Sequence, residues 1–166
     1  MTPNRHGAAS IEFPNELEIL LTRDFEAPIE LVFDVLTSPQ HVSKTVAPFG
    51  EEVTKCSIDL RVGGKYHFVF VTDDGTECSF RGTFLEVEPP TRTVETWQFE
   101  GWPDVQAVET QDLLEANGVT TLTWKLAFLD QAGRDHWTKT DGLEANFDNT
   151  EDLLRSLLDP DGTVPG

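Results

Sequence analysis

The sequence predicts an α+β fold in which a curved antiparallel sheet wraps around one long C-terminal helix. Two changes of period indicate it: apolar residues first recur at helical spacing, then alternate with a period of two through the middle of the chain, and return to helical spacing after Gly133. We therefore expect seven strands, two short helices after the first strand, and a long closing helix.

The first strand and the two short helices come at the beginning of the chain. β-Branched and apolar residues over 17–25 predict the strand. Ala27-Pro28 then opens a helix, because proline fits the first helical turn and apolar residues follow at positions 29, 32, 33 and 36. The stretch Thr37-Ser38-Pro39-Gln40 has capping-box spacing and predicts a second helix that ends near Val46.

Six further strands follow in the region of period two. We expect them over residues 53–61, 65–72, 77–87, 93–99, 105–115 and 119–129. Turn residues separate these runs, and Asn117-Gly118 is the strongest signal for a short hairpin. The strands should form an antiparallel meander. A helix over 134–158 then presents Leu143, Phe147 and Leu154 on one face.

Length and composition predict one folded domain. A chain of 166 residues, 38% of them hydrophobic, is within the usual size of a single domain and can build a core. We expect the domain over 16–158, with flexible tails over 1–15 and 159–166, where Pro and Gly accumulate.

The acidity of the chain limits its partners. The chain has 12 Lys and Arg residues and 30 Asp and Glu residues, which gives a formal net charge of −18. Such a field repels phosphate, so we expect neither nucleic acid nor a membrane as partner. The charge is interpreted as serving solubility, with a docking surface for a basic protein as the alternative. A homodimer is left open. The start of the chain lacks a signal peptide and no run is long enough to span a membrane, so the prediction is cytoplasmic.

No standard catalytic or metal-binding motif occurs in the sequence. Cys56 and Cys78 do not form a metal-ligand pair, and the four histidines are far apart. We therefore assign no catalytic residue, no metal and no cofactor. The strand residues suited to acid–base chemistry are His67, Arg81, Glu95 and Glu109, and the alternation favours solvent-facing positions for the last three.

A strongly curved sheet cannot fill the whole space above its helix, so an internal cavity is expected. Aromatic residues on the strands would form its walls, although each of them could also be ordinary core. His67, Thr140 and Asn146 would orient a ligand. The candidate ligand-binding residues are Phe33, Phe49, His67, Phe68, Phe70, Phe80, Trp97, Trp124, Thr140, Leu143, Asn146 and Phe147.

Several segments in register resemble one known family. They are Phe25-Glu26-Ala27-Pro28, the stretch Ile58-Asp59-Leu60-Arg61-Val62-Gly63-Gly64-Lys65, the stretch Phe80-Arg81-Gly82-Thr83-Phe84, and Phe99-Glu100-Gly101-Trp102-Pro103-Asp104. The resemblance covers about 17–158 and is to the homologues of the activator of the heat-shock-chaperone ATPase, in the SRPBCC (START/Bet v-type) superfamily. It implies a helix-grip fold with a hydrophobic cavity.

The chain departs from many relatives at two places. Thr45 to Gly50 replaces an aromatic pair followed by Gly-Pro, which implies a different cavity mouth. Asn146 follows Gly142-Leu143 where relatives often have a further glycine, which implies a more polar ligand contact.

Superfamily relatives bind lipids, hormones or polyketides, so the resemblance does not select one function. The leading hypothesis is binding or carriage of a small hydrophobic or aromatic molecule. The alternatives are a cofactor-free cyclase or dehydratase acting on a polyketide-like substrate, and a protein-interaction or chaperone-associated adaptor.

Overall fold

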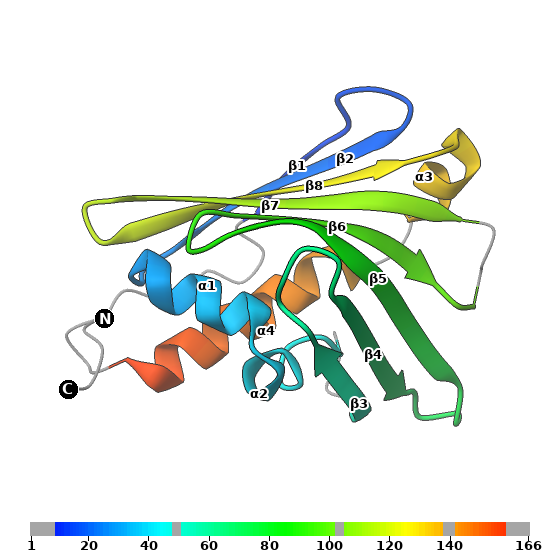
Figure 1. Ribbon diagram of the computed structural model, residues 1–166, viewed down its shortest axis with the longest axis horizontal. Coiled ribbons are helices and arrows are strands. Elements are labelled where there is room, and N and C mark those ends of the chain that lie inside the picture. Colours follow the sequence, from blue (N-terminus) through cyan, green and yellow to red (C-terminus); the bar gives the residue numbers. More distant parts are fainter. Residues whose placement is uncertain (1–8, 48–50, 102–104, 138–141, 159–166) are drawn as a thin grey trace.

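The computed structural model describes residues 9–47, 51–101, 105–137 and 142–158. Within them, one antiparallel sheet curves over the helices (Figure 1). The strands are β1 Ser10–Glu12, β2 Glu18–Phe25, β3 Glu52–Ile58, β4 Lys65–Val71, β5 Glu77–Glu88, β6 Arg92–Phe99, β7 Gln106–Ala116 and β8 Val119–Phe128. The helices are α1 Ile29–Thr37, α2 Pro39–Val42, α3 Gln131–Trp137 and α4 Gly142–Leu157.

The sheet has the order β1-β2-β8-β7-β6-β5-β4-β3. Strands β3 to β8 form the expected meander, and β2 returns to pair with β8 along its whole length, from Glu18 opposite Ala127 to Phe25 opposite Thr120. Helices α1 and α2 connect β2 to β3 at the other edge, and with α4 they lie under the concave face of the sheet (Figure 1). The predicted α+β helix-grip architecture is confirmed.

Three details differ from the sequence prediction. The second helix, expected to end near Val46, ends at Val42. The sheet has an eighth strand, because residues 10–12, expected in a flexible tail, pair with Leu20–Thr22 of β2. All three side chains of β1 are exposed, so no alternation of apolar residues could reveal it. The helical region after Gly133, expected as one helix over 134–158, is described as two helices, α3 and α4.

Local sequence chemistry explains the hairpin between β7 and β8. Asn117 and Gly118 both have positive φ, 54° and 79°, and Ala116 pairs directly with Val119. A two-residue turn of this kind twists in the same sense as the strands, and asparagine and glycine tolerate positive φ best. The turn thereby sets the register between β7 and β8.

The core lies between the concave face of the sheet, α1 and α4. Alternate residues of β2 and β8 supply its base, among them Ile19, Leu21, Leu122 and Leu126, all almost fully buried. Phe147 and Leu154 of α4 pack against them. The apolar contacts cover β2 closely, whereas a cavity remains over the strands from β4 to β8.

Candidate functional site

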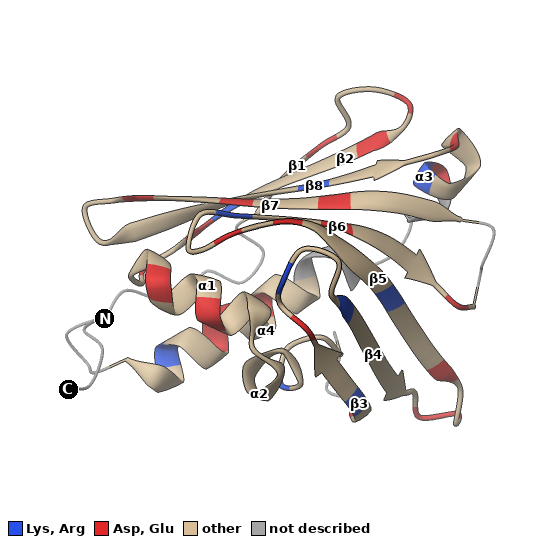
Figure 2. Cartoon of the chain, viewed as in Figure 1, with Lys and Arg blue, Asp and Glu red and all other residues tan. Residues whose placement is uncertain are grey.

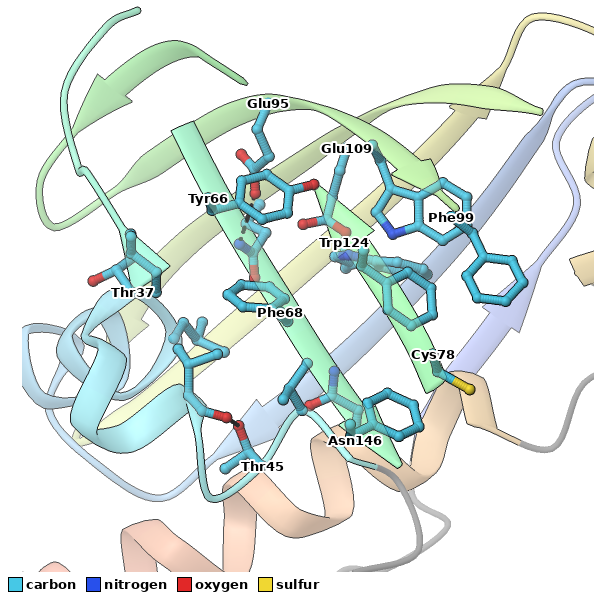
Figure 3. A pocket seen from close by; sticks show the side chains of 18 of the residues that line it. Thr37, Thr45, Tyr66, Phe68, Cys78, Glu95, Phe99, Glu109, Trp124 and Asn146 are labelled. Atoms are coloured by element: carbon cyan, nitrogen blue, oxygen red, sulfur yellow. Dashed lines mark hydrogen bonds between the residues drawn. The ribbon is translucent and has the colours of Figure 1, made fainter. Parts of the chain in front are cut away.

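A cavity of about 530 Å³ lies between α4, the α1–α2 segment and the concave faces of β4 to β8 (Figure 3). The side chains that enter it come from alternate positions of each strand, because successive side chains of a strand point to opposite faces. On β4 these are Tyr66, Phe68 and Phe70. The curvature of the sheet and the small residues Thr37 and Thr45 opposite it leave this space open.

Aromatic side chains form most of the cavity wall. They are Tyr66, Phe68, Phe70, Phe80, Phe84, Trp97, Phe99, Trp124 and Phe147. The rings contact one another: the Phe80 centroid lies 4.9 Å from that of Phe99 and 5.7 Å from that of Trp97, and Trp124 meets Phe147 edge to face at 5.7 Å. Such contacts hold the rings in place, so the wall is preformed.

Two glutamates share one region of this wall. Glu95 of β6 lies directly opposite Glu109 of β7 in the strand register, and both side chains line the cavity next to Tyr66 (Figure 3). Glu95 is only 3% exposed, whereas Glu109 is partly exposed. Two carboxylates at paired positions in an apolar cavity repel each other and are poorly hydrated, so full ionisation of both is unfavourable.

Both carboxyl groups have raised pKa values. Burial raises the pKa of Glu95 well above its usual range, and the charge of Glu109 and a hydrogen bond to it raise it further. Burial also raises the pKa of Glu109, although hydrogen bonds from Glu95 and from the indole of Trp124 oppose the rise. These directions favour a pair that holds one proton between its two carboxyl groups, with the proton belonging to the pair as a whole.

Polar neighbours fix the two carboxyl groups. The amide of Gln111 donates a hydrogen bond to Glu95 Oε1 at 3.2 Å and another to Thr93 Oγ1 at 3.3 Å. The hydroxyl of Tyr66 donates to the carbonyl of Thr96 at 2.7 Å. Burial, together with the charges of Glu109 and Glu95, raises the pKa of Tyr66 well above its ordinary value, so this residue stays neutral. The region can therefore hold and move a proton without a metal ion.

Several predicted ligand-binding residues come together in this cavity. Those that line it are Phe68, Phe70, Phe80, Trp97, Trp124, Asn146 and Phe147. Phe49 and Thr140 lie outside the described residues, as does the side chain of Leu143.

Two predicted ligand-binding residues lie elsewhere. Phe33 belongs to the core, and Leu36 and Thr37, one turn later in α1, line the cavity in its place. His67 points to the opposite face of β4, since it alternates with Tyr66 and Phe68. There its Nε2 lies 2.7 Å from Ser79 Oγ and 4.0 Å from Glu100 Oε1. Neither residue is placed to orient a ligand in the cavity.

The expectation that Glu95 and Glu109 face solvent is wrong. A signal for their true orientation was present, because Glu95 lies two residues before Trp97, which was expected in the cavity, and period two puts both on one face. The orientation of Glu109 follows from the pairing of β6 with β7, and the sequence does not specify that pairing. Arg81 does face solvent, where its Nε lies 3.4 Å from Glu100.

Other kinds of site find no support in the described part of the chain. No group of three or more His, Cys, Asp and Glu residues there could hold a metal ion. Among the described residues, no helix combines the length and the apolar character that crossing a membrane requires.

Comparison with known proteins identifies the family. The model of the family described as activator of Hsp90 ATPase homolog 1-like protein matches residues 26–158. No curated protein is significantly similar to the chain in sequence.

Solved structures share the fold. A Rhodobacter sphaeroides protein superimposes with a TM-score of 0.82 at 21% identity, over 90% of this chain and 99% of that one. A Chromobacterium violaceum protein gives 0.72 at 25% identity, over 85% and 97%. An HSP90 activator from Plasmodium falciparum gives 0.53 at 22% identity, over 67% and 72%. Because the family model spans most of the sequence, the chain belongs to the family of activator of Hsp90 ATPase homolog 1-like proteins.

Proposed function

We propose that this protein binds a small, largely apolar or aromatic molecule in the cavity between the sheet and α4. The observation that carries the proposal is a preformed aromatic cavity of about 530 Å³ with a few polar groups in one region. Ligand sites in proteins have volumes of roughly 300 to 1,000 Å³ and this same combination of apolar wall and few polar groups.

Burial of the ligand would supply the affinity. Removal of about 300 Å² of apolar ligand surface from water contributes about 7.5 kcal/mol, from which the loss of translational and rotational freedom is subtracted. Rings already fixed by their neighbours, such as Phe80 between Phe99 and Trp97, lose little freedom on binding. The polar groups of Gln111, Asn146 and the glutamate pair would orient the ligand.

Native mass spectrometry tests the proposal directly. The purified protein is measured before and after organic extraction, and again after addition of fatty acids, flavonoids and aromatic polyketides. We expect a copurified or selectively bound molecule at one per chain. Absence of any adduct, from cells, from all three classes and from a hydrophobic amine added in the same way, would contradict ligand binding.

The two cysteines allow the bound molecule to be located. Cys78 lines the cavity, whereas Cys56 does not and lies 3.6 Å from the carbonyl of Pro39. Burial raises the pKa of both thiols, so alkylation is followed at mildly alkaline pH, where enough thiolate is present. A ligand in the cavity should slow alkylation of Cys78 and leave Cys56 unchanged. If Cys78 is alkylated at the same rate with and without the ligand, the ligand binds outside the cavity.

The glutamate pair favours a second candidate function, a cofactor-free cyclase or dehydratase. The pair holds one proton between its two carboxyl groups, so the protonated group could protonate a leaving hydroxyl while the ionised group removes a proton. A bound polyketide should then lose water during incubation. The reaction should be slowed at least a hundredfold in Glu109→Gln and unchanged in Glu88→Gln, which removes an exposed carboxylate of β5. An unchanged ligand mass in the wild-type protein would contradict dehydration and leave binding intact.

The adaptor function remains a proposal supported by family membership and by the likeness to the Plasmodium HSP90 activator. Acidic residues are distributed over both strands and helices, which would suit a basic partner surface (Figure 2). Titration with an Hsp90-type chaperone tests it. Salt-sensitive binding that ligands do not affect would support an adaptor, and absence of binding at low salt would contradict it.

A further inference from the structure

The ligand cavity is acidic, which bears on the class of molecule that fits it. The described residues that line it include three carboxylates, Glu51, Glu95 and Glu109, and no Lys, Arg or His. A ligand with a carboxylate or phosphate group would therefore meet like charge, with no described cation nearby to compensate it. A cationic group would meet opposite charge.

One carboxylate oxygen in this wall has no hydrogen-bond donor apart from the neighbouring carboxyl group. Glu95 is 3% exposed, its Oε1 accepts from Gln111, and its Oε2 is buried with no described donor other than a proton shared with Glu109. A buried charge without a partner is strongly unfavourable. The raised pKa values of Glu95 and Glu109 are consistent with this, because a proton held between the two groups relieves part of the repulsion. A ligand cation would do the same.

The surroundings of the pair suit a cation with an apolar body. Glu109 is the more exposed of the two residues and lines the cavity, with Glu95 beside it on the next strand (Figure 3). Tyr66, Trp97 and Trp124 line the same cavity. The faces of aromatic rings attract ammonium groups, and the attraction is stronger where the groups are desolvated.

We infer that the preferred ligand is an amphipathic organic cation, a hydrophobic amine whose ammonium group contacts Glu109 while its apolar body fills the aromatic cavity. The inference rests on the proposed binding function and narrows it to one chemical class. Fatty acids and other anionic amphiphiles are then poor ligands of this cavity, although the fold would accommodate their size.

The test uses three probes that each carry a phenyl group on a chain of four carbons and differ in the head group. They are 4-phenylbutylamine, 4-phenylbutanol and 4-phenylbutyrate, which are cationic, neutral and anionic at neutral pH. Binding to the full chain is measured by isothermal titration in 0.15 M salt, and Cys78 protection confirms that each bound probe occupies the cavity. We expect the amine to bind at least tenfold more tightly than the alcohol, and the butyrate more weakly than both.

Variants separate a local contact from the general charge of the protein. Glu109→Gln should lose at least tenfold in affinity for the amine and little for the alcohol. Glu95→Gln keeps the shape of the side chain and leaves Glu109 in place, so it should change the affinity for the amine less than Glu109→Gln does. Glu88→Gln removes the same unit of charge at an exposed position of β5 and should leave all three affinities unchanged. Thermal melting verifies that each variant is folded.

Each outcome decides the question. Tighter binding of the amine that depends on Glu109 supports the inference. Equal or tighter binding of the butyrate, or a preference for the amine that survives in both glutamine variants, overturns the cationic class while binding in the cavity stands. Failure of all three probes to bind or to protect Cys78 overturns the inference and counts against the proposed function as well.

Discussion

Glu95 and Glu109 show how one strand register creates chemistry that neither residue has alone. Each would be an ordinary exposed carboxylate on an isolated strand. Pairing of β6 with β7 places them opposite each other, and the curvature of the sheet removes both from bulk water. The cost of two buried like charges is then expressed as raised pKa values and a shared proton.

This pair predicts a dependence of stability on pH. Both pKa values are higher in the folded state than in the unfolded chain, so the folded state binds more protons, and the free energy of unfolding falls as the pH rises above about 4.5. The glutamine in Glu95→Gln cannot ionise, so this variant should be more stable than the wild-type protein at pH 7 to 8. The gain is about 1.4 kcal/mol for each pH unit by which the pKa of Glu95 in the folded state exceeds its pKa in the unfolded chain. Urea unfolding at pH 5 and pH 8 measures this. A variant that is equally destabilised at both pH values would contradict it.

Arg23 shows the opposite case, a buried charge that is paired with two opposite charges. Its guanidinium group is 0% exposed and contacts Asp148 and Glu151 of α4, the latter at 3.4 Å. The ring of Phe25 lies 5.5 Å away. The cation thereby connects β2 to the helix across the core.

Removal of this cation should destabilise the protein strongly. Arg23→Met keeps the aliphatic stem but leaves Asp148 and Glu151 without their buried partner, at an expected loss of about 3 kcal/mol in the free energy of unfolding. Arg92→Met removes a cation from a half-exposed pair with Asp112 and should lose less than about 1 kcal/mol. Urea unfolding of both variants gives the comparison, and equal losses would refute the buried role of Arg23.

At the scale of elements, strand β5 needs a glycine at the point where it lies close to Thr96 of β6 and Tyr66 of β4. A Cβ atom at Gly82 would lie 1.8 Å from the carbonyl oxygen of Thr96 and 2.8 Å from a ring carbon of Tyr66. Backbone cannot withdraw from such a contact without loss of the β5–β6 pairing. Gly82 therefore permits the position of Tyr66 beside the glutamate pair.

Gly82→Ala should destabilise the fold and disturb the site together. We expect a loss of about 3 kcal/mol or more, because the added methyl group overlaps backbone rather than a flexible side chain. Thr83→Ala, at the next position of β5, is the control and should lose less than about 1 kcal/mol. Thermal unfolding gives the stability. A Gly82→Ala protein as stable as the control would mean that β5 can shift freely.

At the scale of the whole molecule, the many acidic side chains repel one another. The net charge of −18 is spread over strands and helices, without a single acidic tail (Figure 2). Repulsion among such charges opposes the compact state, and salt screens it over a distance of about 10 Å at 0.1 M.

The melting temperature should accordingly rise as sodium chloride is increased from 10 to 150 mM. Calorimetry at pH 7.5 measures it, and the rise should be smaller at pH 4.5, where the net charge is close to zero. A salt effect of equal size at both pH values would indicate general salt effects rather than screening.

The sequence alone determined the order and type of most elements. Period two and the turn residues located β3 to β8, and Asn117-Gly118 marked the tightest hairpin, because these signals are local and depend on backbone preferences. It also identified the aromatic wall from Phe68 to Phe147, since alternation shows which residues share a face.

Only the tertiary structure decided the polar chemistry of the cavity. The opposition of Glu95 and Glu109 depends on the register between two strands, the exclusion of His67 depends on which face of β4 is concave, and β1 depends on an available edge of β2. These are relations between segments distant in space or in sequence. Local periodicity does not specify them, because whether a strand residue faces cavity or solvent is decided by the curvature and pairing of the whole sheet.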